Sequence, residues 1–432
     1  MEMFLRLEEA WDVTLRRTDA CPVETVPLFD AYGRVLAAAV QAKAPFPPFD
    51  RSALDGYAVR AADIQGASPD APVELQVLEE VPAGTVPERV VGAGQAAKIM
   101  TGAPIPVGAD AIVRKEAAEL LGNPAGRNSE SADGEGAEGL CQHAIVRILM
   151  DVPAGEAISV QGEDAPQGAM LLEAGTRIGA AETALLATNG EAMVPVYRRP
   201  RVGILVSGSE VRPLSGELLP GQIRDSNGPM LAALVRDLGG EPVLYGQVGD
   251  ELEEIAARVK QMAAECDLVL TTGGVSVGDY DVMRDAYVQA GGEVVFWKVT
   301  MRPGTPVTFA EIAGTPVFGL SGNPAAAYVN FVMLVVPVLR KLAGLSQVLP
   351  RPVKAVLDSA GSAKVIGLDR FLRAELVSLD GQLVARAGKG QKAAILTSLV
   401  GIQGLVRIPA REEAPNGSLV DVYLLQEGAL SR

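Results

Sequence analysis

A glycine-rich loop with hydroxyl and carboxylate side chains lies in the second half of the chain. Residues 271–279 read Thr-Thr-Gly-Gly-Val-Ser-Val-Gly-Asp, after an apolar run and before a segment of helical character. Glycines let backbone N–H groups converge on an anion beside a helix N-terminus. The loop lacks the GK[ST] and GxGxxG patterns of nucleotide-binding loops, and an ordinary strand-to-helix turn is the alternative. The substrate-binding residues predicted here are Gly273, Gly274, Ser276 and Gly278.

Two carboxylates accompany this loop. Asp250 follows the strand-like run PVLYGQV, and Asp281 stands just beyond the glycines. A carboxylate at such a position either caps the following helix or binds a metal ion that bridges phosphates. The sequence leaves both interpretations open, and we predict that the pair holds a divalent metal.

Basic and polar residues follow the next strands. Lys298 lies at the end of EVVFWKV and Arg302 follows it, where a point charge and a planar fork suit a tetrahedral oxyanion, although such residues are more often surface charges. From Val295 to Arg407 the chain has 13 Lys and Arg against 5 Asp and Glu, which favours a small-anion site or else a solvated face. A further turn enters a long helix. Asn323 as N-cap and Pro324 at N1 of that helix explain this turn structurally, and the alternative is that its free amides meet a ligand. The substrate-binding residues predicted here are Ser321, Gly322, Asn323 and Pro324.

The elements that must position these residues alternate between strand and helix from residue 201 onward. This alternation predicts a doubly wound, mostly parallel sheet with ligands at the carboxyl ends of its strands. Short runs broken by Pro and Gly predict β-rich modules before it and a small β-barrel after it. The predicted domains are a discontinuous helical and linker domain (1–45 and 145–180), a β-rich domain (46–144) with a flexible insert at 121–139, an α/β domain (181–345) and a C-terminal β domain (346–432).

Composition excludes several classes of function. A net charge of -15 over 432 residues disfavours nucleic-acid binding. One histidine and three cysteines without CxxC spacing exclude a His-based triad and a structural zinc site. The N-terminus lacks signal-peptide character, and the longest apolar stretch, Phe331 to Leu339, is too short to span a bilayer. We therefore expect a cytoplasmic enzyme without membrane partners.

Several segments, taken in order, resemble one family. PPFDRSALDGYAVRAADI, KIMTGAPIP, GILVSGSEV, RDSNGPML, TTGGVSVGDYD, FWKVTMRPGTPVTF and GLSGNPAAAYVNF are similar to the MoeA and gephyrin E-domain family of molybdopterin molybdenumtransferases. The resemblance implies an elongated homodimer with four domains per chain, one of them MogA-like. It also implies insertion of molybdate into molybdopterin from adenylylated molybdopterin, with Mg²⁺ and with release of AMP. A MogA-like adenylyltransferase and acceptor molybdoenzymes would be its partners.

The resemblance also assigns functional positions. It places them on Asp55, Thr101, Asp164, Glu210, Asp250, Asp281, Lys298, Pro324 and Arg373, and with Arg302 they complete the predicted catalytic and metal-binding set. Arg302, Thr305, Ser321 and Ala393 depart from the usual Lys, Lys, Pro and Ser of the family, with Lys389 or Lys392 as compensating charges. These departures leave two alternatives: a tungstate-preferring or specialised paralogue, or a pterin-binding scaffold without turnover.

Overall fold

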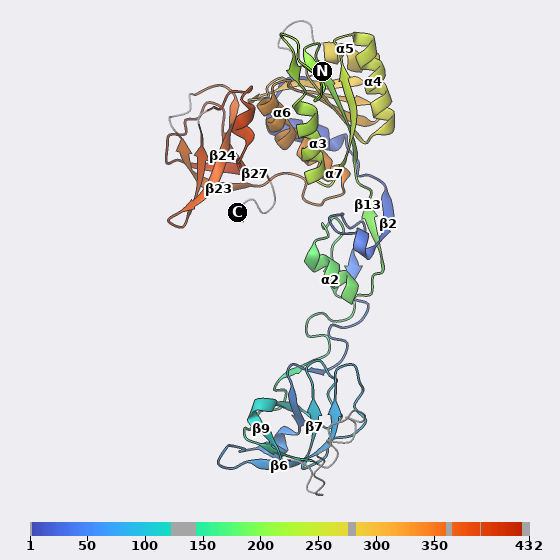
Figure 1. Ribbon diagram of the computed structural model, residues 1–432, viewed down its shortest axis with the longest axis vertical. Helices are drawn as coiled ribbons and strands as arrows, with labels where there is room; N and C mark the ends of the chain where they lie inside the picture. Colours follow the sequence, from blue (N-terminus) through green and yellow to red (C-terminus); the bar gives the residue numbers. More distant parts are fainter. Residues whose placement is uncertain (1, 122–143, 275–281, 360–364, 389, 426–432) are drawn as a thin grey trace. The chain divides into compact units, whose positions relative to one another are not determined.

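The computed structural model describes residues 2–121, 144–274, 282–359, 365–388 and 390–425, which form two compact units (Figure 1). One unit comprises residues 39–172, and the other comprises residues 1–38 and 173–432. All but the first residue of the predicted insert at 121–139 lies outside the described residues, as do Ser276, Gly278 and Asp281.

The larger unit contains a seven-stranded sheet in which only β21 runs against its neighbours. This arrangement confirms the prediction of a doubly wound, mostly parallel sheet. In spatial order the strands are β1 (Glu2–Leu5), β19 (Glu293–Val299), β21 (Thr308–Ile312), β22 (Thr315–Leu320), β18 (Leu268–Thr272), β14 (Arg201–Ser207) and β17 (Glu241–Val248).

Helices cover both faces of this sheet, since alternate strand residues are apolar on both sides. Leu268 and Leu270 of β18 join the core under one helical layer, whereas Val269 joins the core under the other. The first layer consists of α1 (Leu7–Arg16), α3 (Asn227–Asp237) and the helix formed by α6 (Pro324–Asn330), a π-helical turn (Phe331–Val335) and α7 (Val336–Leu342). The second consists of α4 (Leu252–Glu265) and α5 (Val282–Gln289).

The continuous helix Pro324–Leu342 has 19 residues and is long and apolar enough to cross a membrane by length and composition. Its most apolar window is 83% buried inside the protein, against the sheet and α1. This burial is typical of the core helix of a folded domain.

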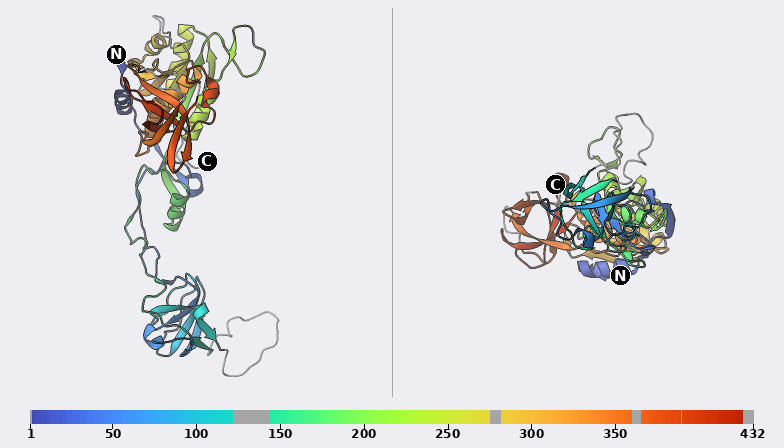
Figure 2. Two further views of the ribbon diagram at one scale, coloured as in Figure 1. Left: turned by 90° about the vertical axis from the view of Figure 1, so that its left-hand side faces the viewer. Right: turned by 90° about the horizontal axis from the view of Figure 1, so that it is seen from below.

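The C-terminal region is a closed barrel of five strands, because β24 pairs with both β25 and β26. The barrel confirms the predicted C-terminal β domain and appears in orange and red in the left view of Figure 2. Its strands are β24 (Asp369–Leu379), β25 (Gln382–Ala387), β23 (Pro352–Ser359), β27 (Leu419–Leu424) and β26 (Gly404–Ile408), with the 3₁₀ turn Leu396–Leu399 between β25 and β26. Strand β20 (Met301–Arg302) adds to β24 from the α/β domain.

A small module of the larger unit contains the residues just before the chain leaves that unit and just after it returns. Strands β2 (Val23–Pro27) and β13 (Met193–Tyr197) pair antiparallel, with α2 (Ala180–Thr188) and a 3₁₀ turn (Leu28–Asp30) beside them. A short excursion after β14 contains β15 (Val211–Arg212) and β16 (Ile223–Arg224).

The smaller unit is built around a six-stranded sheet, in agreement with the β-rich character of its sequence. Its strands in order are β8 (Ala111–Arg114), β5 (Gly56–Val59), β7 (Gln95–Ile99), β6 (Val73–Val81), β10 (Ile145–Ile148) and β9 (Ala118–Leu120). The 3₁₀ turns Ala61–Ile64 and Lys115–Ala117 flank it. Two short pairs complete the unit: β3 (Val40–Gln41) with β12 (Met170–Leu172), and β4 (Arg51–Ser52) with β11 (Ile158–Ser159).

Two segments pair with sheets that lie outside the domains to which the predicted boundaries assign them. Glu2–Leu5 forms the edge strand of the α/β sheet, and Ile145–Ile148 pairs with β6 of the β-rich sheet. Strand pairing between residues far apart in the sequence decides such boundaries, and local composition does not report it.

Arg407 joins the barrel to the α/β domain through two carboxylates. Its guanidinium donates to Asp369 at 2.9 and 2.5 Å and pairs with Glu8 of α1 at 2.7 Å. Hydrogen bonds from Arg407 to Tyr423 and Glu8 and the nearby charge of Asp369 raise the pKa of the Arg407 guanidinium, although its burial opposes the rise. The Asp369 side chain is only 12% exposed and also accepts the Ala410 N–H.

We therefore expect Asp369→Ala to lower the free energy of unfolding by about 2–4 kcal/mol, because it leaves a largely buried cation with only the half-exposed carboxylate of Glu8 as an ion-pair partner. Urea unfolding monitored by circular dichroism measures the loss. The matched variant Glu8→Ala removes a carboxylate that is half exposed and should cost less than about 1 kcal/mol. Equal losses for the two variants would contradict the assignment of the buried pair.

Candidate active site

The parallel strands β14, β17, β18 and β22 end at one edge of the sheet. Ser207 is in register with Val248, Val206 with Thr272, and Thr272 with Leu320. The loops that follow these strands therefore emerge side by side, as expected for a doubly wound sheet. They carry Glu210, Asp250, Gly273, Gly274 and the segment 321–323, so the structure brings these predicted residues together.

The first two glycines of the 271–279 loop are required by close backbone contact. A Cβ on Gly273 would lie 2.1 Å from the Ser207 carbonyl oxygen, and one on Gly274 would lie 2.8 Å from the Met283 side chain. Both residues have positive φ angles, +93° and +65°. Only glycine fits these positions, which brings the β18 loop against the end of β14.

Asn227, at the start of α3, ties two of these loops together. Its Nδ2 donates to Thr272 Oγ1 at 2.8 Å and to the Gly322 carbonyl at 2.9 Å, and Thr272 Oγ1 donates to the Ser321 carbonyl at 3.0 Å. Asn227 is 6% exposed, and its Oδ1 is buried and has no hydrogen-bond partner among the residues that the structure describes. By residue type, Ser226 and Asn227 before a helical segment predict a helix cap at this position, and nothing in the sequence predicts the bridge. The location of Asn227 after Asp225-Ser226 in the RDSNGPML segment was the available signal for that cap.

Replacing this side chain tests the bridge. Asn227→Ala removes two hydrogen bonds and leaves the buried Thr272 hydroxyl without its donor, so we expect a loss of about 1–3 kcal/mol in the free energy of unfolding. Chemical denaturation measures it. The control Asn416→Ala removes an exposed asparagine that accepts only the Ser359 N–H, and its effect should stay within about 0.5 kcal/mol. A neutral Asn227→Ala variant would show that the bridge does not stabilise the loops.

Asp250 is exposed at the end of β17, and its Oδ2 accepts the Ser209 N–H at 3.3 Å. It does not cap α4: the cap residue is Glu251, which makes no side-chain capping bond. Glu210 lies in the neighbouring loop with its carboxylate over Gly208, where a Cβ would lie 2.7 Å from Glu210 Oε2. Of the two alternatives for Asp250, the geometry favours a ligand-facing carboxylate.

The first turn of the helix that begins at Pro324 differs from expectation. Asn323 is the N-cap and Pro324 stands at N1, as predicted. However, Ala325 N–H donates to the Ala393 carbonyl at 3.1 Å, Ala326 N–H to the Asn323 carbonyl at 3.0 Å, and Asn323 N–H to Ser321 Oγ at 3.3 Å. Of the predicted residues, Asn323 therefore has its N–H engaged within the protein, and Pro324 has no N–H to offer a ligand.

Arg373 lies in the barrel beside this turn and is 1% exposed. Its Nη2 donates to the carbonyls of Gly390 and Lys392 at 3.0 and 3.3 Å, and its backbone N–H donates to Gln391 Oε1. Nε and Nη1 are buried and, within the described part of the chain, have no partner. Burial lowers the pKa of the guanidinium. Arg373 is therefore a desolvated cation with donors to spare, which an anion would stabilise.

The end of β19 and the segment after it carry the other predicted cations. Lys298 has a left-handed backbone with φ +78°, and Arg302 is exposed. Thr305 Oγ1 donates to the Met301 carbonyl at 2.5 Å, and the buried Asn330 donates to the Gly304 carbonyl at 2.8 Å. The family's usual second lysine is thus replaced by a threonine that closes its own loop, and Asn330 is a further contact that the sequence did not indicate.

In the smaller unit, Asp55 and Thr101 are in direct contact. Asp55 Oδ1 accepts both the backbone N–H and the Oγ1 of Thr101, at 2.8 and 2.7 Å, and Lys115 Nζ lies 3.7 Å from Oδ2. The hydrogen bond from the Thr101 backbone, then that from its side chain, lower the pKa of Asp55. Asp164 is exposed, and its N–H donates to the Phe46 carbonyl.

We expect Thr101→Val to raise the pKa of Asp55 while leaving it below its ordinary value, because the backbone N–H of residue 101 still donates. A carboxyl carbon NMR titration measures the shift, with Thr85→Val as a control that leaves Asp55 untouched. The folded pKa is depressed, so the stabilisation from Asp55 is present above its unfolded pKa and is lost as pH falls through the folded value. An unchanged Asp55 titration would contradict the contact.

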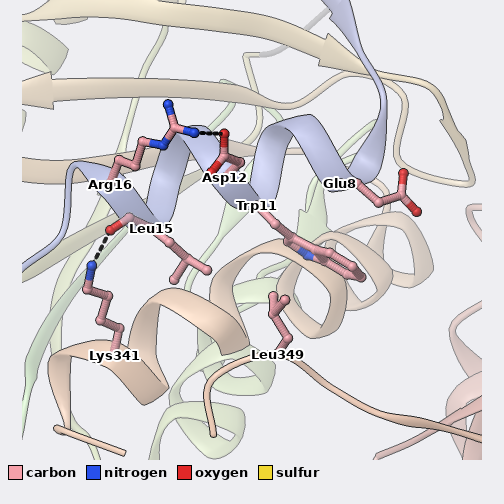
Figure 3. Close-up of a pocket in the computed structure, with 7 residues that line it drawn as sticks. All are labelled: Glu8, Trp11, Asp12, Leu15, Arg16, Lys341 and Leu349. Atoms are coloured by element: carbon pink, nitrogen blue, oxygen red, sulfur yellow. Dashed lines mark hydrogen bonds and ion pairs between the residues drawn. The ribbon is translucent and has the colours of Figure 1, made fainter. Parts of the chain in front are cut away.

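A cavity of about 390 Å³ lies away from this sheet edge, between α1, α7 and the segment before the barrel (Figure 3). It is lined by Glu8, Trp11, Asp12, Leu15, Arg16, Lys341 and Leu349. Lys341 is 17 residues from Pro324 along one helix, a distance of about 25 Å. Arg16 pairs with Asp12, Lys341 donates to the Leu15 carbonyl and Glu8 pairs with Arg407, so the charged rim is internally satisfied.

Comparisons with known proteins agree along the whole chain. Three family models match: the MoeA N-terminal region (domain I and II) at residues 5–190, a probable molybdopterin binding domain at 203–341, and the MoeA C-terminal region (domain IV) at 361–425. A molybdopterin molybdenumtransferase of Bacillus subtilis is 38% identical over 94% of this chain and 90% of its own length. One from Staphylococcus aureus is 34% identical over 98% of this chain and 96% of its own length. The crystal structure of a molybdopterin biosynthesis moeA protein from Pyrococcus horikoshii, 31% identical, covers 98% of this chain and 100% of its own with a TM-score of 0.78.

Proposed function

Because this chain belongs to the family of molybdopterin molybdenumtransferases, the transferases of molybdenum cofactor biosynthesis, we propose that it takes adenylylated molybdopterin and molybdate and releases AMP in a Mg²⁺-dependent reaction. The dithiolene sulfurs of the pterin would be the ligands that receive the molybdenum. The proposal requires no cysteine of the protein as a ligand. The described cysteines, Cys21 and Cys266, are both buried, and burial raises the pKa of each thiol.

The observation that carries the proposal is the convergence of four loops at the carboxyl edge of the sheet. The β18 loop approaches the Ser207 carbonyl so closely that Gly273 accepts no side chain, and Asn227 bridges two of the loops. Such an edge presents carboxylates and backbone groups to a phosphate-bearing ligand from fixed positions. Placement and neutralisation of charge are the main means of catalysis in phosphoryl chemistry.

The residues at this edge fit a magnesium ion. Mg²⁺ prefers oxygen ligands and usually takes one or two carboxylates, with water and substrate phosphates as its other ligands. Among the described residues no cluster of three or more His, Cys, Asp or Glu surrounds a metal position, but Asp250 stands exposed at the end of β17. Asp250, together with Asp281, would hold the ion, which supplies charge neutralisation at the phosphoanhydride when bound.

The oxyanion would be held by Lys298, Arg302 and Arg373. Arg373 supports this assignment most directly, since a buried guanidinium with two unpaired nitrogens is stabilised by an anion. We further propose that the chain works as a cytoplasmic homodimer, which sedimentation of the purified protein tests. The pterin-binding scaffold without turnover is not favoured, because a scaffold has no use for an exposed carboxylate at a strand end beside a glycine cradle.

The decisive experiment incubates the purified protein with adenylylated molybdopterin, Mg²⁺ and either molybdate or tungstate. AMP release and metal incorporation are read in parallel. AMP release together with metal incorporation supports the proposal. The ratio of molybdenum to tungsten incorporated decides between a molybdate enzyme and a tungstate-preferring paralogue. Binding of the pterin without AMP release in either arm would identify a scaffold.

Asp250→Asn removes one charge while nearly preserving shape and the contact with Ser209 N–H. We expect AMP release at limiting Mg²⁺ to fall more than about 10-fold, which corresponds to about 1.4 kcal/mol of lost transition-state stabilisation. The control Glu253→Gln removes a charge from the first turn of α4, and its activity should stay near wild type. Wild-type turnover of Asp250→Asn at limiting Mg²⁺ would show that this carboxylate does not hold the ion.

A further inference from the structure

Trp297 lies two residues before the end of β19, and its ring makes cation–π contacts with two side chains. The Arg284 guanidinium of α5 lies 4.2 Å from the ring centroid, and Lys298 Nζ lies 3.8 Å from it. The Lys298 ammonium is also 5.2 Å from the ring of Phe4, in the edge strand β1. Aromatic faces attract cations through the ring quadrupole, so two rings from neighbouring strands hold one ammonium group.

The backbone at Lys298 departs from the strand. Its φ of +78° is rare for a residue with a side chain, and it persists because Lys298 N–H donates to the Val307 carbonyl and Val299 N–H to the Thr305 carbonyl. Such conformations cost free energy and are kept where they serve a purpose. Here the left-handed turn allows Lys298 to fold back over the ring of the residue that precedes it.

Lys298 also lacks a counter-charge. Among the described residues no carboxylate forms an ion pair with it. Lys298 lies at the carboxyl edge of the sheet. Its neighbour Trp297 pairs with Thr308, and Thr308 pairs with Gly319, one residue before the end of β22. An ammonium that is held by ring faces keeps its N–H donors for another acceptor.

We propose that Trp297, assisted by Phe4, is a positioning residue that holds the Lys298 ammonium at the carboxyl edge of the sheet for a tetrahedral oxyanion. This inference rests on the proposed function in one respect, namely that Lys298 binds the oxyanion. The side chain acts through its ring face, because the indole Nε1 is buried and has no hydrogen-bond partner in the described parts of the chain.

The role of the ring predicts different outcomes for two substitutions. Trp297→Phe keeps an aromatic face and should leave the apparent molybdate constant within about twofold of wild type. Trp297→Leu keeps apolar bulk without a quadrupole and should raise that constant about fivefold with kcat changed less than twofold. The matched control is Phe296→Leu, the neighbouring aromatic residue, which is fully buried on the opposite face of β19 and should leave the constant unchanged.

Combination with Lys298→Ala separates positioning from general damage. If the ring acts through Lys298, Trp297→Leu should add less than twofold to the molybdate constant of Lys298→Ala. Equal effects of Trp297→Leu with and without Lys298 would overturn the inference while leaving the proposed function in place. If Lys298→Ala itself leaves the oxyanion constant unchanged, the assignment of the oxyanion to Lys298 fails, and the inference fails with it.

A binding measurement without turnover completes the test. The chain has two tryptophans, so in Trp11→Phe the emission comes from Trp297 alone. Molybdate bound at Lys298 should change that emission, since it adds negative charge beside the ring, and Lys298→Ala should abolish the change at the same molybdate concentrations. This titration keeps Trp297 intact, so it remains decisive if Trp297→Leu does not fold. An emission insensitive to molybdate in a variant that still turns over would overturn the inference.

Discussion

The candidate site depends on close approach of backbone segments at the carboxyl edge of the sheet. The β18 loop lies against the end of β14 because Gly273 has no side chain, and Asn227 fastens the same loop to the turn that follows β22. These contacts fix the β18 loop against the end of β14 and against the turn after β22. A site for a phosphate-bearing ligand requires this rigidity, since charge neutralisation is effective only when the charged groups are already in place.

The basic part of the site obeys a different constraint. Lys298 comes from the end of β19 and lies over two aromatic rings. Arg373 comes from the barrel and is buried beside the carbonyls of Gly390 and Lys392. The barrel reaches the α/β domain through the Ala393 carbonyl and through Arg407. Barrel docking therefore determines where Arg373 lies relative to the sheet edge.

The departures from the usual family pattern acquire a physical meaning in this setting. Thr305 closes the loop that contains Arg302 by bonding the Met301 carbonyl, and Ser321 bonds the N–H of the cap residue Asn323. Thr305 thus makes a contact within the loop where the family usually has a lysine, and Ser321 makes one where the family usually has a proline. Ala393 contributes only its carbonyl to the helix that begins at Pro324. Under the proposed function, Lys298 and Arg373 would then carry more of the charge at the oxyanion.

Much of this was determined by the sequence alone. Alternating apolar runs and helical segments predicted the parallel sheet, and the order of strand ends predicted that Asp250 and the glycine loop share one edge, because side-chain period and strand direction are local properties. The cap at Asn323 and Pro324 followed from residue type in the same way. Only the tertiary structure showed that Glu2–Leu5 joins the sheet, that Ala393 occupies an amide of the long helix, and that Asn227 bridges two loops. Each of these contacts joins residues distant in the sequence, and no local pattern encodes which distant partner will satisfy a given donor or strand edge.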